Sequence, residues 1–70
     1  MMPICFADVN TEVVIKDIKG NDKMKKHLQT LGFQIGEVVT IVNKVDENII
    51  LKIKGVSMAL SMELARRIII

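Results

Sequence analysis

Residues branched at Cβ dominate the apolar part of this 70-residue chain, and they constrain its fold more than any other feature. Half of the residues are hydrophobic, but only two are Phe and none is Tyr or Trp, so a core has to be aliphatic. Branching at Cβ suits the pleated backbone of strands better than it suits helices. Ordering a chain of this length costs on the order of 100 kcal/mol, so most of the aliphatic surface must be buried. We therefore predict one mainly β domain over residues 1–70, with little sequence left over for a catalytic pocket.

Short runs rich in Ile and Val recur along the chain and are typical of strands. We predict strands at residues 12–19, 37–45, 49–54, 56–60 and 68–70. The first run loses its alternation near Lys16 and Asp17, which indicates a bulge or a sharp bend. Residues 46–48 and Gly55 supply tight turns between the later strands. This order predicts an antiparallel meander that curls into a small barrel and so removes its exposed edges.

One short helix is expected between the first two strands. Met24, Leu28 and Leu31 follow one another at i, i+4 and i+7, which places one apolar stripe on a helix at about residues 22–31. Gly32 comes directly after this stripe, as expected for a residue that ends a helix with a positive φ. We predict a second helical turn at about residues 61–66, where Ser61 can act as the N-cap.

The charge pattern argues against an electrostatic partner. The formal net charge is only +2, and no exposed aromatic residue is expected on which a nucleic-acid base could stack. Nucleic-acid binding is the weakest alternative, since only five basic residues could form a patch for it: Lys23, Lys25, Lys26, Arg66 and Arg67. A single cysteine fits a reducing compartment, and no apolar run approaches the roughly 20 residues of a membrane span. We expect a cytoplasmic protein without direct membrane insertion.

The side chains that carry chemistry are too scattered to predict an enzyme. The carboxylates lie among turns and strand ends, and the four glycines form no phosphate-binding loop. Cys5 and His27 could in principle pair as nucleophile and base, but Cys5 lies in an apolar amino-terminal segment, which does not favour a reactive thiolate. The same two residues are the only weak candidates for metal ligands, whereas a metal site needs three or four converging groups. We therefore predict no enzyme activity, no catalytic residues and no resident cofactor.

Several segments resemble the FeoA family, the small proteins of bacterial ferrous iron uptake. Residues 28–36 are similar to the family's L-x-x-l-G-l-x-x-G signature, and Val39 and Ile41 match its V-x-V strand. Residues 58–70 resemble the family's carboxyl-terminal pattern, and residues 6–9 resemble its opening. The positions to which this pattern assigns a structural role are Leu28, Gly32, Gly36, Leu60, Ala65 and Ile68.

The resemblance implies an SH3-like barrel that binds another protein. Its implied partner is FeoB, the membrane ferrous iron transporter, through the transporter's cytosolic part, and its implied role is that of an accessory or regulator of uptake. A domain that senses or binds a transition metal, ferrous iron above all, is the alternative. The sequence leaves open whether the chain forms a homo-oligomer.

Four residues are predicted to contact a partner: His27, Leu31, Phe33 and Ile69. His27 stands where the family commonly has an arginine. Phe33 is an aromatic residue in a short connector, so it is either part of the core or an exposed anchor. Residues 68–70 are three isoleucines that cannot all face inward on one strand, so Ile69 is expected to face outward at a contact surface or a dimer edge.

Overall fold

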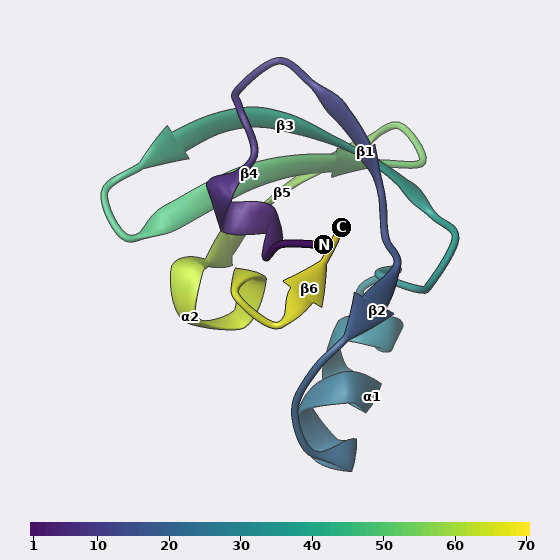
Figure 1. Cartoon of the computed structure of the whole chain (residues 1–70). Coiled ribbons are helices and arrows are strands. Elements are labelled where there is room, and N and C mark those ends of the chain that lie inside the picture. Colours follow the sequence, from purple (N-terminus) through teal and green to yellow (C-terminus); the bar gives the residue numbers. More distant parts are fainter.

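Two antiparallel sheets form the body of the molecule in a computed structural model that describes residues 1–70 (Figure 1). The larger sheet has the order β1-β3-β4-β5, and the smaller sheet pairs β2 with β6. The strands are β1 (Glu12–Val14), β2 (Asp17–Ile18), β3 (Val38–Val45), β4 (Asn48–Ile53), β5 (Val56–Ser61) and β6 (Ile68–Ile69). The helical elements are a 3-10 turn η1 (Ile4–Phe6), the helix α1 (Asp22–Thr30) and the short helix α2 (Met62–Ala65). The prediction of a mainly β fold with one short helix and one helical turn is confirmed.

The predicted bend in the first strand is the point at which the chain changes sheets. The Ile15 amide donates to the carbonyl of Glu37, at 3.0 Å, on the side of the larger sheet. The next amide, that of Lys16, donates to the carbonyl of Ile69 at 2.7 Å, on the side of the smaller sheet. Alternating backbone groups thus tie consecutive residues to two different sheets, which explains why the hydrophobic alternation breaks here.

The core lies between the inner faces of the two sheets and is closed by the helices. Alternation along β3 and β4 buries Val39, Ile41, Ile49, Leu51 and Ile53. The core cluster also includes Ile4, Ala7, Ile15, Leu28, Phe33, Leu60, Ala65 and Ile68. Burying one such aliphatic side chain stabilises the fold by about 1.5–3 kcal/mol, so the Ile and Val content of the chain is largely used here.

Both helices begin at side-chain caps. The Asn21 side chain accepts a hydrogen bond from the Met24 amide at 2.9 Å, and the Ser61 hydroxyl accepts one from the Leu64 amide at 3.2 Å. Gly32 follows α1 with φ at +103°, in the left-handed region that glycine tolerates best. These caps confirm the predicted starts of both helices.

The larger sheet departs from the prediction in two places. The pairing of β3 with β4 shifts between Ile41 and Asn43, so Val42 is an extra residue that simple alternation did not indicate. In addition, β5 is hydrogen-bonded to β4 alone and forms one edge of the sheet. The expectation that barrel closure would remove the exposed edges is therefore wrong for β5.

Candidate partner-binding surface

The four predicted contact residues do not form one surface. His27 is exposed on α1, and Leu31, the C-cap residue of that helix, is half-buried against the core. Phe33 is fully buried and Ile69 is only 9% exposed. The structure thus leaves two of the four residues accessible to a partner.

Phe33 belongs to the core, so its interpretation as an exposed anchor is wrong. It is among the largest side chains that are completely buried. Its amide donates to the carbonyl of Leu28 at 3.0 Å, which fixes the connector directly beneath the end of α1. A chain with so few aromatic residues uses this one to fill the space between the helix and the sheets.

The prediction that Ile69 faces outward is also wrong, and the reason is a segment far away in sequence. Met2 and Ile70 exchange two backbone hydrogen bonds of 2.9 and 2.8 Å, and Pro3 forms a β-bridge with Ile69. The amino-terminal segment therefore lies along one side of β6 while β2 lies along the other. The amino-terminal segment and β2 together shield Ile69 from solvent. The alternation of side chains within a single strand cannot reveal such neighbours.

Ile35 is one of several accessible apolar residues that sequence reasoning missed. Phe6 in η1 is another, at 69% exposed, so the expectation of no exposed aromatic residue is wrong. The Glu37 amide donates to the Gln34 carbonyl at 3.1 Å and closes a four-residue turn, and Gly36 in this turn has φ at +94°. A glycine with positive φ at the third position is typical of a type II turn, which places Ile35 at the apex. Its side chain is 66% exposed. The Ile-Gly pair is the sequence signal that could have identified this apex.

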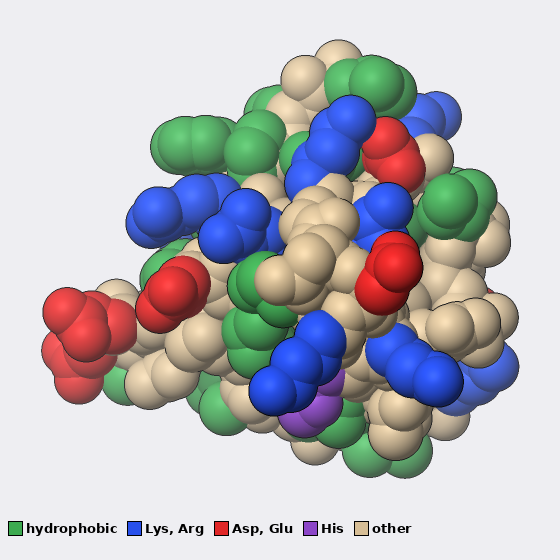
Figure 2. Space-filling view, turned by 90° about the horizontal axis from the view of Figure 1, so that it is seen from below, with side chains coloured by type: hydrophobic (Ala, Val, Ile, Leu, Met, Phe, Trp, Pro, Cys, Tyr) green, Lys and Arg blue, Asp and Glu red, His purple; other side chains and the backbone are tan.

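A shallow cleft of about 360 Å³ lies beside Ile35, between α1 and β2. Its walls are Asp17 and Ile18 from β2, Lys25 and Gln29 from α1, and Gln34 and Ile35 from the connector, with Phe33 beneath them. Seen from the side of α1, lysine and arginine side chains are spread over this face of the molecule (Figure 2). Polar side chains around an exposed apolar residue are the usual pattern of a protein interface.

Asp17 is the titratable group of the cleft with a shifted pKa. Its carboxylate accepts a hydrogen bond from the Ile18 amide at 2.8 Å and forms an ion pair with the Lys19 ammonium at 3.0 Å. The Lys19 hydrogen bond, followed by the Ile18 amide, lowers the pKa of Asp17 from its usual 3.8. Asp17 is therefore ionised at neutral pH and offers a fixed negative charge beside Lys25.

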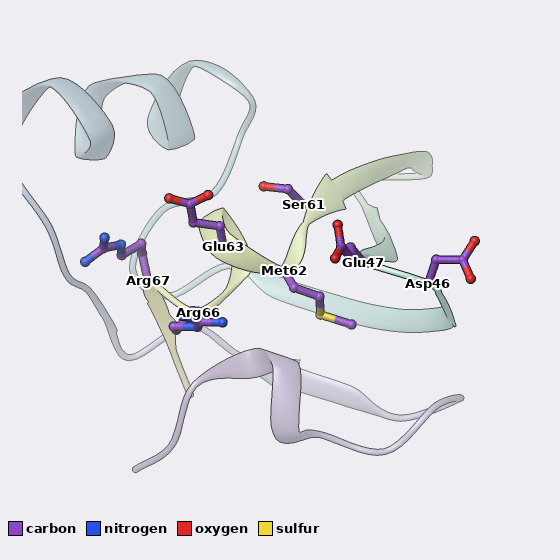
Figure 3. A pocket seen from close by; sticks show the side chains of 7 residues that line it. All are labelled: Asp46, Glu47, Ser61, Met62, Glu63, Arg66 and Arg67. Atoms are coloured by element: carbon purple, nitrogen blue, oxygen red, sulfur yellow. The ribbon is translucent and has the colours of Figure 1, made fainter.

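A second hollow, of about 480 Å³, lies between α2 and the turn that joins β3 to β4 (Figure 3). Asp46 and Glu47 come from the turn, whereas Arg66 and Arg67 follow α2. The molecule's two ion pairs, Lys19–Asp17 and Lys54–Glu37, lie elsewhere, so none joins these opposite charges. Met62 is the only hydrophobic lining residue, so this larger hollow lacks the apolar anchor that the α1 cleft has in Ile35.

The described residues bring no metal-binding cluster together. Nowhere do three or more His, Cys, Asp or Glu side chains gather closely enough to hold a metal ion. Cys5 is half-buried in η1, whereas His27 is exposed on α1. Neither of the two helices has the length and apolar character that crossing a bilayer requires.

Comparison with known proteins identifies relatives over nearly the whole chain. A family model described as FeoA domain matches residues 2–70. The crystal structure of an iron uptake regulatory protein, FeoA, superposes with a TM-score of 0.88 at 21% identity, over 96% of this chain and 89% of that one. Comparison with curated proteins gives no match.

Two further structures illustrate the range of the fold. Stenotrophomonas maltophilia FeoA, an SH3 domain protein crystallised with zinc, has a TM-score of 0.84 at 25% identity, over 99% of this chain and 88% of that one. ScaR with bound Zn²⁺ has a TM-score of 0.87 at 17% identity, and the match covers 97% of this chain but 35% of ScaR. The same SH3-like arrangement therefore occurs both in proteins of this size and within a longer one.

Proposed function

Because the chain belongs to the FeoA domain family, which is associated with ferrous iron transport, we propose that it is a non-enzymatic accessory protein that binds the cytosolic part of a FeoB-type transporter. Binding there regulates ferrous iron uptake. The observation that carries this proposal is the family match over residues 2–70, which leaves almost no part of the chain outside the domain. The cargo iron is handled by the transporter, and the accessory protein contributes a surface.

The surface we propose for this contact is the α1 cleft with Ile35 at its rim. Ile35 stands out from a turn that two backbone hydrogen bonds hold in place: Glu37 amide to Gln34 carbonyl at 3.1 Å, and Gly36 amide to Ile15 carbonyl at 2.8 Å. A rigidly mounted apolar side chain loses little conformational freedom on binding, so more of its burial contributes to affinity. Burial of a side chain of this size contributes about 1.5–3 kcal/mol.

The charged rim supports orientation more than affinity. Lys25 on α1 and the ionised Asp17 on β2 face the same cleft, so the rim presents both signs within a short distance. Exposed charges of this kind mainly steer association and exclude wrongly oriented partners. Lys23 and Lys26 are exposed on the same helix but do not line the cleft, so Lys25 is the cation that faces it.

Titration calorimetry of the full chain with the cytosolic region of the transporter from the same genome tests this proposal, with and without guanine nucleotide. We expect saturable binding, and we expect Ile35→Ser to weaken it at least about tenfold, or about 1.4 kcal/mol. Val45→Ser is the matched control, because Val45 is an exposed aliphatic residue at the far end of β3. Absence of any association with a folded chain would remove the proposed function. Equal losses in the two variants would remove the assignment of the surface.

A further inference from the structure

The edge strand β5 lacks the features that usually protect a strand edge. Edge strands of natural proteins commonly carry charges, a proline or a bulge that prevents pairing with another chain. The sequence of β5 is Val-Ser-Met-Ala-Leu-Ser, without charge or proline, and its six residues pair with β4 in unbroken register. Ser57 and Ala59 are exposed. The strand is therefore open to another strand along its whole length.

The turn before β5 determines which of its backbone groups face the open edge. Lys54 and Gly55 form a two-residue turn with φ at +51° and +80°, a combination typical of type I′ hairpins. In such a hairpin the closing pair, Ile53 and Val56, exchanges hydrogen bonds, and alternate pairs along the ladder do the same. The amides and carbonyls of Ser57, Ala59 and Ser61 consequently point away from β4. No backbone hydrogen bond outside the strand ladder uses Ser57 or Ala59, whereas the carbonyl of Ser61, the N-cap residue of α2, faces the first turn of that helix.

We propose that this edge binds a second copy of the chain, with β5 antiparallel to β5 around a two-fold axis at Ala59. Antiparallel pairing joins outward-facing residues, and the register that uses all three places Ala59 opposite Ala59 and Ser57 opposite Ser61. The two four-stranded sheets then become one continuous sheet of both copies. A two-fold contact of this kind is self-complementary, because each copy offers the same strand.

The side chains of β5 are complementary in this register. On the inner side, Val56 lies beside Met62 of the second copy, and Met58 lies beside Leu60 of the second copy. Val56 is 57% exposed in the single chain, and this pairing covers it. On the outer side only Ser57, Ala59 and Ser61 meet, and their small size allows the strands to approach to hydrogen-bonding distance.

The charges at the two ends of β5 favour the antiparallel arrangement. Lys54 lies in the turn before the strand, and Glu63 lies in the first turn of the helix after it. The proposed register brings Lys54 close to Glu63 of the second copy, and symmetry repeats this pair. Lys54 can reach across, because its side chain is 66% exposed even while it pairs with Glu37. Parallel pairing would instead bring Lys54 close to Lys54 and Glu63 close to Glu63.

Charge substitutions on the proposed axis test both the partner and the register. Sedimentation equilibrium of the full chain should show a monomer–dimer equilibrium. Ala59→Lys and Ala59→Glu each place two like charges opposite one another, so each variant alone should dimerise at least about tenfold more weakly. An equimolar mixture of the two variants should recover the dimer as a heterodimer, because residue 59 then meets the opposite charge.

Val14→Lys is the matched control, since it places the same charge on an exposed residue of β1, the other edge strand of the sheet. It should leave dimerisation unchanged. Amide hydrogen exchange at Ser57 and Ala59 should slow at least about tenfold between dilute and concentrated solutions, which supports the register without any substitution. Three results would each overturn the proposal: a wild-type chain that stays monomeric at millimolar concentration, a dimer indifferent to Ala59→Lys, or a dimer lost in Val14→Lys.

Discussion

The connector after α1 and the edge strand β5 both lie at the surface, but they expose different parts of the chain. In the connector the backbone is tied down by hydrogen bonds, and one side chain, Ile35, stands out from it. In β5 the side chains on the outer face are small, and the backbone groups of alternate residues stand open. The first arrangement suits a partner that receives a side chain, and the second suits a partner that supplies a strand. In our two proposals, a small barrel with a filled interior keeps two separate binding surfaces.

The largest effect that we expect separates the two apolar residues of the connector. Phe33→Ala should destabilise the fold by about 3–5 kcal/mol, because it leaves a cavity at the centre of the core. Ile35→Ala should change stability by no more than about 0.5 kcal/mol, because its side chain stands in solvent. Urea unfolding followed by circular dichroism measures both values. Similar losses for the two variants would show that Ile35 is a packing residue and would end its role as an anchor.

Gly36 completes the turn that carries Ile35. A substitution at Gly36 therefore tests how much the conformation of this turn contributes to the stability of the fold. An added Cβ would meet nothing within 4 Å, so Gly36→Ala adds only the strain of a positive φ, about 1–2 kcal/mol. Gly36→Asn should cost less, because asparagine tolerates this region better. The same urea titration measures both variants. A larger loss for asparagine than for alanine would mean that the space, and not the backbone conformation, limits this position.

The independence of the two surfaces is the sharpest test of the comparison. Ile35→Ser should weaken binding to the transporter region at least about tenfold and leave self-association unchanged. Ala59→Lys should show the reverse pattern, because Ala59 and Ile35 lie in separate elements with no shared contacts in the cleft. Calorimetry and sedimentation equilibrium on the same preparations give both readings. If either variant impaired both kinds of binding, the two surfaces would be one.

The smallest expected effect concerns the carboxylate in the cleft. The folded-state pKa of Asp17 is lowered, so its contribution to stability is fully present above its unfolded value of about 3.8 and is lost as the pH falls through the folded value. Asp17→Asn keeps an oxygen for the Ile18 amide but removes this charge. Below about pH 4, wild type should therefore lose stability slightly more steeply than the variant. If the free energy of unfolding fell equally steeply with pH in wild type and in Asp17→Asn, the ion pair of Asp17 with Lys19 would contribute nothing to the stability of the fold.

Local patterns predicted much of this fold, and contacts between distant segments account for what they missed. The runs of Ile and Val predicted the strand that contains Val39 and Ile41, and the loss of alternation located the bend near Lys16, because both depend on neighbours along one strand. Ile69 was misassigned because Met2 and Pro3, at the other end of the chain, shield it. The bulge at Val42 and the open edge of β5 likewise arise from strand pairing, which one strand's pattern does not encode.

The candidate site was harder to predict than the core. Phe33 and Ile35 are two residues apart in one connector, and hydrophobicity alone gives no reason to bury the first and expose the second. The difference comes from the turn around Gly36, which carries Ile35 outward after the chain has passed beneath α1. A reading of turn types, in addition to periodicity, would have favoured Ile35.

Amide chemical shifts offer the most direct test that this chain acts through its outer surface on a transporter. The labelled full chain would be titrated with the cytosolic region of the FeoB-type protein and its backbone amides followed. We predict shifts concentrated on α1 and residues 33–36, while the amides of β3 and β4 in the core keep their positions. Unchanged spectra at saturating partner, or changes spread evenly through the barrel, would contradict the account.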